Sequence, residues 1–500
     1  MKKILTAISV SLLLSNFINA QSDEDALRYS QLMYGSSGRG LGAGSAFGAL
    51  GGDYSSLVIN PAGVSIFQNN QFSISPSFLS IKSNSLFDSN SSEEHKYNFN
   101  ASGFGIVWVK QLDEKNSGKW RNLNFAFGGN RIAGFHNNVY YTGFNPSSSL
   151  AEKFVESVNS SGGITTNEIS NAYPFDAGLA YETALLQTFS NDTTQYWALT
   201  EGGGVKQEQT YTTRGGMTEY AFTMGANYND KLYIGGSLGF VDINYRYSSG
   251  YTETDINDSI DYFKSFTLDQ SQSTNGTGIN VKFGLIARLN DYIRLGGSVH
   301  SPSFLFLSDR YSSSMKTVLD DTLGTYNADS PIGKYDYNLT TPWRLNGSLA
   351  LTFKKYGFLS FDYEFLDYSE AFFSFNDDNS TDGKSYENNL NQTINNKYGS
   401  SYNIRIGGEA SLDVIRFRAG YALYGSPFKS GVAQSGFDNK ATVYSGGIGI
   451  KQDAYFIDFG FGRTKYASFL QPYSLAGVDV PGVKLNTYTN QFTFTIGWKW

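Results

Sequence analysis

The sequence predicts an all-β fold, an antiparallel transmembrane β-barrel of about fourteen strands, and three observations favour it. Among 500 residues there are 54 Gly, 38 Phe and 35 Tyr, and the mean hydropathy is −0.32. After residue 20, no stretch of sequence is apolar for the roughly 20 residues that a spanning helix needs. Instead, segments of alternating apolar and polar residues recur, joined in turn by tight turns and long polar connections. Barrels of the outer-membrane type show this alternation of short periplasmic turns and long extracellular loops.

The composition excludes several other classes of protein. A chain with 40% hydrophobic and 17% charged residues is too apolar to be disordered. Because the chain has no Cys, it cannot be a disulfide scaffold. Its 38 Lys and Arg against 45 Asp and Glu give a net charge of −7, so no basic surface field is available for nucleic acid. We therefore expect no nucleic-acid partner.

Residues 1–20 have the features of a cleavable signal peptide. Lys2 and Lys3 precede an apolar run over residues 4–14, and the small residue Ala20 ends the segment. Ser15 and Asn16 interrupt the run, which is too short for a membrane anchor. The segment predicts export, and the barrel pattern places the exported chain in the bacterial outer membrane. No Cys follows the signal to carry a lipid.

The strand pattern is clearest at the C-terminus and defines residues 71–500 as the barrel. There, one face carries Phe492, Phe494, Ile496, Trp498 and Trp500, and the residues between them are small or polar. Earlier strands are paired by tight turns at 229–230, 290–291, 354–357, 413 and 452–453, which are rich in Asn and Asp. We expect strands at residues 72–82, 97–111, 123–142, 207–228, 231–248, 265–288, 292–305, 335–353, 358–373, 400–412, 414–427, 440–451, 454–467 and 485–500.

The long connections are expected at residues 83–96, 143–206, 249–264, 306–334, 374–399, 428–439 and 468–484. Within the second of these, residues 150–158 carry apolar side chains at helical spacing, and residues 177–187 are another candidate helix. Two interpretations stay open, because a long loop can be an ordinary packed loop or a lid over a ligand.

Residues 21–70 do not have the pattern of a barrel strand. A glycine-rich run over residues 35–53 is followed by Asn60, Pro61, Ala62 and Gly63, and so many glycines allow compact, irregular backbone in a confined space. A dinucleotide-binding loop would require a preceding strand in a βαβ unit, and the run is preceded only by a polar, helix-like stretch.

These residues carry a resemblance to a known family. Gly51-Gly52-Asp53, then Asn60-Pro61-Ala62-Gly63, the barrel pattern and the aromatic C-terminus resemble the FadL/TodX family of outer-membrane transporters for hydrophobic compounds. Further similarities lie at 341–345, 361–368 and 418–421. The resemblance implies a 14-stranded barrel whose lumen is plugged by an N-terminal hatch, here residues 21–70, with Asn60, Pro61, Ala62 and Gly63 as the hatch motif. It also implies a pocket for long-chain fatty acids or aromatic hydrocarbons, and an inward kink in the third strand that opens a side exit.

Two sets of residues are candidates for the transport path. In the third strand, Gly128, Gly129 and Asn130 interrupt the alternation, and paired glycines mark a bulge or bend. We interpret these residues as the kink at a lateral opening. They could equally ease the curvature of the barrel. The alternation also directs Arg344 and Arg405 into the lumen. They could bind a ligand carboxylate, or form ion pairs that anchor the hatch, because an unpaired buried charge is costly.

Catalysis finds little support in the sequence. His95, His136 and His300 lie far apart, and neither a zinc-protease nor a serine-hydrolase motif is present. We therefore expect no enzyme activity, no metal and no cofactor; haem uptake has no supporting ligand spacing.

The sequence thus predicts a monomeric barrel in contact with outer-membrane lipid, which passively transports hydrophobic small molecules. The alternatives are a noncatalytic structural or secretion-associated barrel that binds partner proteins through its extracellular loops, and an ordinary aqueous porin, which the hatch-like segment opposes.

Overall fold

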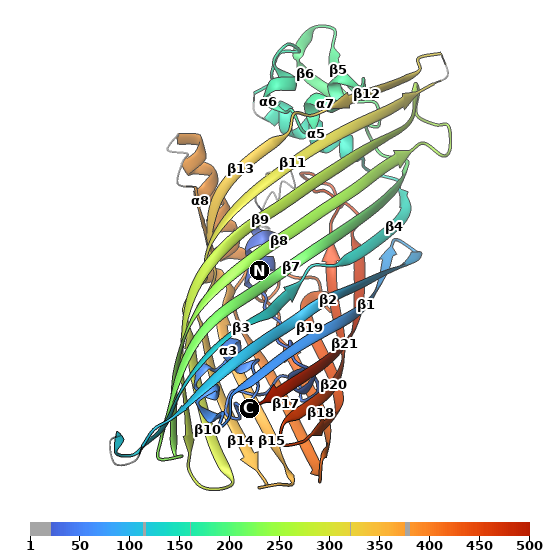
Figure 1. Cartoon of the computed structure of the whole chain (residues 1–500). Helices are drawn as coiled ribbons and strands as arrows, with labels where there is room; N and C mark the ends of the chain where they lie inside the picture. The colour runs from blue at the N-terminus through green and yellow to red at the C-terminus, as the bar shows by residue number, and fades with distance from the viewer. Residues whose placement is uncertain (1–21, 114–116, 161, 321, 376–380) are drawn as a thin grey trace, which may run out of the picture.

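The computed structural model describes residues 22–113, 117–160, 162–320, 322–375 and 381–500. The predicted signal peptide, residues 1–20, lies outside them. Nineteen strand segments form one antiparallel sheet that closes on itself (Figure 1). The first strand, β1 (Gln71–Phe87), pairs with the last, β21 (Val483–Lys499), from Gln71 opposite Lys499 to Phe87 opposite Val483. No helix in the described part of the chain is long and apolar enough to cross a membrane.

The nineteen segments make fourteen barrel strands, which confirms the predicted fold class. Where a barrel strand is interrupted, its two or three segments count as one strand. In chain order after β1 the segments are β2 (Asn90–Gln111), β3 (Trp120–Gly134) with β4 (Asn137–Asn145), β7 (Val205–Tyr228), β8 (Leu232–Thr254), β9 (Phe263–Arg288), β10 (Ile293–His300) with β11 (Phe304–Leu319), β12 (Thr325–Asp329) with β13 (Gly333–Thr340) and β14 (Arg344–Thr352), β15 (Gly357–Asp367) with β16 (Phe372–Ser374), β17 (Ser400–Leu412), β18 (Ile415–Tyr424), β19 (Asp438–Lys451), β20 (Tyr455–Leu470) and β21.

The tight turns lie where the sequence predicts them. Asn229, Asp230, Lys354 and Asp413 adopt positive φ angles of 50° to 55°, a conformation that Asn and Asp tolerate in short hairpins. The outer wall is apolar: alternate side chains such as Phe222, Phe240, Leu345 and Phe361 are more than a third exposed. Because such a wall requires an apolar solvent, the arrangement is that of a membrane-spanning barrel.

Two of the predicted long connections are wrong predictions, because the structure has strands over most of their residues. Residues 83–96 form the end of β1 and the start of β2, joined by a turn at Asp88, and most of residues 306–334 belongs to β11, β12 and β13. A sheet that rises out of a membrane meets water on its outer face and needs no apolar alternation there. The sequence signal therefore fades although the hydrogen-bonded ladder continues.

Residues 143–206 contain a small subdomain at the end of the barrel that carries the long loops, which the sequence predicts to be extracellular (Figure 1); we name this subdomain the lid. The predicted helix over 150–158 is confirmed as α5 (Leu150–Ser160). The predicted helix over 177–187 is too long, because α7 (Ala177–Glu182) ends early and β5 (Leu186–Phe189) pairs with β6 (Asp192–Ala198). A short helix, α6 (Ile169–Ala172), completes the lid. Its apolar side chains pack on Phe263, Phe266 and Met315 of the barrel.

A buried carboxylate joins the lid to the barrel. Glu253 of β8 accepts hydrogen bonds from the backbone N–H of Leu150 at 2.9 Å, from Tyr251 at 2.7 Å and from Gln207 at 2.9 Å, and also one from the Ser149 hydroxyl. Burial raises the pKa of Glu253, and these donors oppose that effect. The start of α5 is thereby fixed to the extracellular end of β8.

A second loop helix, α8 (Thr381–Lys397), lies in a connection that the sequence leaves as a polar loop. The side chains of Leu390 and Ile394 in α8 are buried. At the end of the helix, Lys397 and Tyr398 each contact Asp23 at 2.7 Å. Asp23 begins α1 (Asp23–Ser30), the first element of the described chain. A loop helix and the N-terminal helix thus hold each other at the extracellular mouth (Figure 1).

Candidate functional site

Residues 22–70, the hatch segment, are largely buried within the ring of strands (Figure 1). Besides α1, the segment contains the short helices α2 (Gly38–Gly42) and α3 (Ser56–Ile59) and the 3-10 helix η1 (Pro61–Ile66). Helix α2 contacts β18 to β21, whereas η1 contacts β3, β7, β8 and β9. The segment therefore touches separate parts of the barrel wall and occupies the lumen between them.

Asn60 is the most connected residue of the predicted hatch motif. Its side-chain amide donates to the carbonyl of Gly48 at 2.6 Å and to those of Leu285 and Gly297 in the wall at 3.3 Å. Its side-chain oxygen accepts a hydrogen bond from the N–H of Ala62 at 3.1 Å. Asn60 thereby caps the start of η1, whose first residue is Pro61. The motif thus ties two parts of the hatch to β9 and β10.

Glycines on the inner wall admit the hatch backbone. A Cβ atom at Gly407 would lie 1.9 Å from the carbonyl oxygen of Ala43, and one at Gly284 would lie 1.9 Å from the Asn60 side-chain oxygen. Both distances are far below van der Waals contact. Similar close approaches occur at Gly235, Gly296, Gly420 and Gly460. Part of the high glycine content is therefore a surface shaped to fit the hatch.

Arg344 and Arg405 point into the lumen and lie on carboxylates. Arg344 contacts Glu364 at 2.9 Å and donates to the carbonyl of Ser30 in the hatch. Arg405 lies 3.6 Å from Glu364 and 3.8 Å from Asp362, and Asp362 accepts from the N–H of Gly48 at 3.0 Å. All four charged side chains are buried. These contacts favour the interpretation that the two arginines anchor the hatch.

A second set of ion pairs holds helix α2 of the hatch to the wall. Glu409 contacts Arg39 of α2 at 3.2 Å and Arg418 at 2.7 Å, and Arg418 continues to Asp458 at 2.6 Å. Because each buried charge has an opposite charge beside it, the cost of removing these groups from water is offset.

The third barrel strand loses one neighbour directly after the predicted kink. Gly128, Gly129 and Asn130 still pair with both β2 and β7, but the ladder between β2 and β3 ends at the pair Gly103–Asn130. On the other side, the register with β7 shifts between Arg131 and Ala133. The kink residues therefore lie at the lower end of a break in the wall, and their role in a lateral opening stays a proposal.

The hatch takes the place of β2 at this break. The N–H of Met33 donates to the carbonyl of Ile132 at 2.8 Å, and the hydroxyl of Ser36 donates to the side chain of Asn130. Met33 is 38% exposed, although the next residues of the hatch are buried. A backbone hydrogen bond from the hatch thus replaces one from the neighbouring strand.

Above the break, side chains close the seam between β2 and β4. Lys96 donates to Asn138 at 3.2 Å, Asn138 donates to the carbonyl of His95 at 3.2 Å, and Asn98 contacts His136 at 3.0 Å. Side-chain hydrogen bonds between long, partly exposed residues are weaker constraints than a backbone ladder, so this seam is held less tightly than the laddered pair of β3 and β7.

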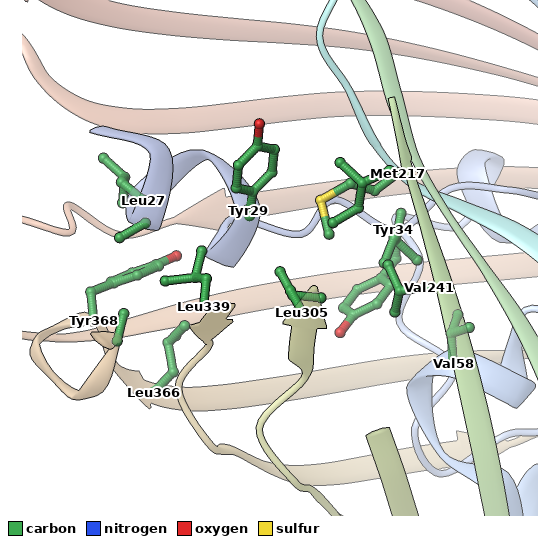
Figure 2. Packing of buried hydrophobic residues seen from close by; sticks show 14 of the residues in the cluster. Leu27, Tyr29, Tyr34, Val58, Met217, Val241, Leu305, Leu339, Leu366 and Tyr368 are labelled. Carbon is green, nitrogen blue, oxygen red and sulfur yellow. The ribbon is translucent and has the colours of Figure 1, made fainter. Parts of the chain in front are cut away.

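A buried apolar cluster extends from the mouth to the break. It contains Leu27, Tyr29 and Tyr34 of the hatch segment, and Leu339 and Leu366 of the wall (Figure 2). Helix α8 adds Leu390 and Ile394 at the mouth, while Ile132 brings the β3 break into the same cluster. We name this set the lumen cluster. It is continuous from the loop helix at the mouth, past the hatch, to the wall at Ile132.

The histidines lie apart. His300 contacts the carbonyl of Ile59 at 3.0 Å and so supports the hatch, while His95 and His136 lie at the β2–β4 seam. Among the described residues no group of three or more His, Asp or Glu could hold a metal ion.

No protein-family model matches the sequence, and no curated protein sequence does. Among solved structures, a Pseudomonas aeruginosa FadL homologue aligns with a TM-score of 0.53 at 10% identity, over 94% of this chain and 99% of that chain. The chain has a FadL-like fold. The FadL-like barrel is also similar to the toluene transporters TodX of Pseudomonas putida (TM-score 0.49, 12% identity, 92% and 99% covered) and TbuX of Ralstonia pickettii (0.48, 13%, 92% and 99%).

Several site residues escape sequence reasoning. Met33 and Ile132 meet through backbone atoms, which leave no mark in a sequence. The helix α8 does leave one, since Tyr386, Leu390 and Ile394 are four residues apart, but the surrounding Asn and Gln residues hide it.

Proposed function

We propose that this FadL-like barrel carries hydrophobic small molecules, such as long-chain fatty acids or aromatic hydrocarbons, passively across the bacterial outer membrane. The lumen cluster is the observation that carries the proposal. A water-filled pore has a polar interior, whereas here buried apolar side chains of one packed cluster extend from the mouth to the wall at Ile132. An apolar solute that displaced these side chains would meet apolar surface instead of water.

The β3 break supplies the exit in this proposal. A solute that reaches Ile132 stands beside the hydrogen bond from Met33 and below the seam of side chains between β2 and β4. Moving Met33 away costs one backbone hydrogen bond, whose net contribution is about 1 kcal/mol. Opening a laddered strand pair would cost several. The solute would leave sideways into the membrane, through the wall next to Gly128, Gly129 and Asn130.

A reversible lock on this contact tests the route. The natural chain has no Cys, so a Met33→Cys, Ile132→Cys double variant carries one designed disulfide. We expect the oxidised variant to lose uptake of a radiolabelled fatty acid or toluene in proteoliposomes, and the reduced variant to regain it. The matched control is Ser77→Cys, Thr493→Cys, two residues that lie directly opposite each other in the ladder between β1 and β21, with their hydroxyls 3.1 Å apart. Its oxidation should leave uptake unchanged.

Solvent extraction of the purified barrel, followed by mass spectrometry, identifies the bound compound class. Uptake that persists in the oxidised Met33→Cys, Ile132→Cys variant would refute the lateral route. An extract without a hydrophobic compound, from a barrel that instead co-purifies with a protein subunit, would favour the partner-binding alternative.

A further inference from the structure

A row of positive charges crosses the outer face of the barrel above the apolar belt. In the register of the sheet, Arg214 of β7 lies opposite Arg246 of β8, and Arg310 of β11 lies opposite Lys334 of β13. Ser273 of β9 lies between the two pairs. All four cations are exposed, whereas their strand neighbours Tyr245 and Asp309 are buried on the inner face. The row therefore points away from the lumen.

These charges are not explained by internal pairing. Within the described residues, Arg214, Arg246 and Arg310 form no ion pair or hydrogen bond, and Lys334 contacts only the exposed Asp336, at 3.0 Å. Like charges directly opposite each other in a sheet are destabilising, and the whole chain carries a net charge of −7. A row of cations that costs stability in an acidic protein points to an anion outside the chain.

The surfaces above and below the row indicate what kind of anion fits. Above it lies a cavity of about 560 Å³, lined by Thr210, Thr212, Ser248, Ser271, Ser312 and Ser314 and by the carboxylates of Asp269 and Asp329. Hydroxyl and carboxylate groups of this kind bind the hydroxyl groups of a sugar.

Below the row lies the apolar belt, where Tyr220, Phe240, Ile279 and Phe304 share one register and Phe306 of β11 lies one step higher. Six residues separate Tyr220 from Arg214 along β7, or about 20 Å at 3.4 Å per residue. At a strand tilt of about 45° this places the cations about 14 Å above the belt. Acyl chains, phosphates and sugars would thus meet the wall in the order in which a glycolipid presents them.

We propose that this face binds a phosphorylated glycolipid of the outer leaflet, such as lipopolysaccharide. Its acyl chains pack on the belt, its phosphates lie on Arg214, Arg246 and Arg310, and its sugars occupy the cavity lined by hydroxyls. Arginine suits the role, because its planar group binds phosphate through two parallel hydrogen bonds. The proposal requires the outer-membrane location but not the transport of a solute, so a lipid-binding measurement tests it separately from the proposed function.

The test measures the Kd of the full chain in detergent for hexa-acylated, bis-phosphorylated lipid A. The variant Arg214→Gln, Arg246→Gln, Arg310→Gln removes three cations from an exposed surface. The control variant Lys231→Gln, Lys354→Gln, Lys355→Gln removes three exposed cations from the turns at the other end of the barrel. Heat-modifiable migration in gels checks that both variants keep the closed barrel.

Each cation near an anionic surface contributes about fivefold to affinity, so we expect the loss of three arginines to raise the Kd about 100-fold. The control variant should change the Kd less than twofold. Added salt should weaken binding to the natural chain. An unchanged Kd in the arginine variant overturns the proposal, as does equal affinity for lipid A stripped of its phosphates. Equal affinity for phosphatidylglycerol, or displacement by millimolar inorganic phosphate, overturns the assignment to a glycolipid.

Discussion

Adding one methyl group to the barrel wall should expel part of the hatch. In the Gly407→Ala variant, the new Cβ would lie 1.9 Å from the Ala43 carbonyl oxygen, where ordinary contact begins at 3.4 Å. The hatch would have to retreat by the difference, about 1.5 Å. Its retreat is limited, because Asn60 on the other part of the hatch is bonded to β9 and β10.

The cost follows from this geometry. Overpacking of a closely fitted interior costs about 1–3 kcal/mol, which corresponds to a loss of about 5- to 150-fold in the stability of the hatch against local opening. The same substitution at a free position in a strand is mildly stabilising, because glycine loses more backbone entropy on folding than alanine does. The predicted loss therefore belongs to the contact with Ala43 and not to the loss of a glycine.

Hydrogen exchange of the amides in residues 41–50 measures this opening, and the conductance of single barrels in planar bilayers measures its effect on the lumen. We expect faster exchange and more frequent conducting events in the Gly407→Ala variant. Gly347→Ala is the matched control, because a Cβ at Gly347 on the outer face of β14 meets nothing within 4 Å. Exchange in the hatch of Gly407→Ala as slow as in the natural chain, or equal loosening by Gly347→Ala, would show that the contact with Ala43 does not hold the hatch.

Two further predictions concern the buried charges and the lid. Arg344→Ala leaves Glu364 buried with fewer partners and should lower the free energy of unfolding by about 3–5 kcal/mol; the double variant Arg344→Ala, Glu364→Gln should recover part of this loss. The single variant should weaken the binding of fatty acids and of hydrocarbons equally. A selective loss of fatty-acid binding would instead assign Arg344 to the ligand carboxylate. Burial raises the pKa of Asp176, which caps α7, to about 6 from an ordinary 3.8. The folded lid thus binds this proton more tightly than the unfolded lid, so its stability is complete below pH 4 and falls as the pH rises to 6. Asp176→Asn, which keeps a capping oxygen and cannot ionise, should match the natural lid at pH 4 and exceed it at pH 7 by at most about 3 kcal/mol, as read from hydrogen exchange of α7; equal exchange at pH 7 would contradict this.

The sequence predicts the parts of the molecule whose surroundings impose a pattern. Inside the membrane one face of each strand meets lipid, so alternation places Arg344 and Arg405 on the inner face, where the structure has them. Tight turns impose positive φ, so Asn229 and Asp413 reveal the short hairpins. Outside the membrane neither condition holds, which is why the pattern predicts loops over residues 83–96 and 306–334, where the structure has strands.

The site itself is harder to predict, because backbone atoms form most of it. Asn60 stands out, since Asn followed by Pro is a recognisable start of a helical turn. The glycine at position 407 shows no sign of the hatch loop that it admits, and Met33 contacts Ile132 through groups that every residue has. The two arginines could be placed on the inner face by parity. Their links to the hatch could not, because Arg344 donates to Ser30, and Asp362, the carboxylate beside Arg405, accepts from Gly48, each 314 positions away in the chain.

The joint between the two ends of the barrel has a consequence for how the molecule is assembled. The N–H of the final residue, Trp500, donates to the carbonyl of Asn70, the last residue before β1, and the Asn70 side chain accepts from the N–H of Val109. The ring is therefore completed at the point where the N-terminal segment leaves the lumen. The closure of the ring and the exit of residues 22–70 from the lumen therefore share Asn70, so the pairing of β21 with β1 and the placement of the plug stabilise each other. A chain without the plug would expose to the lumen the backbone of inner-wall glycines such as Gly407 and Gly284, which the plug covers.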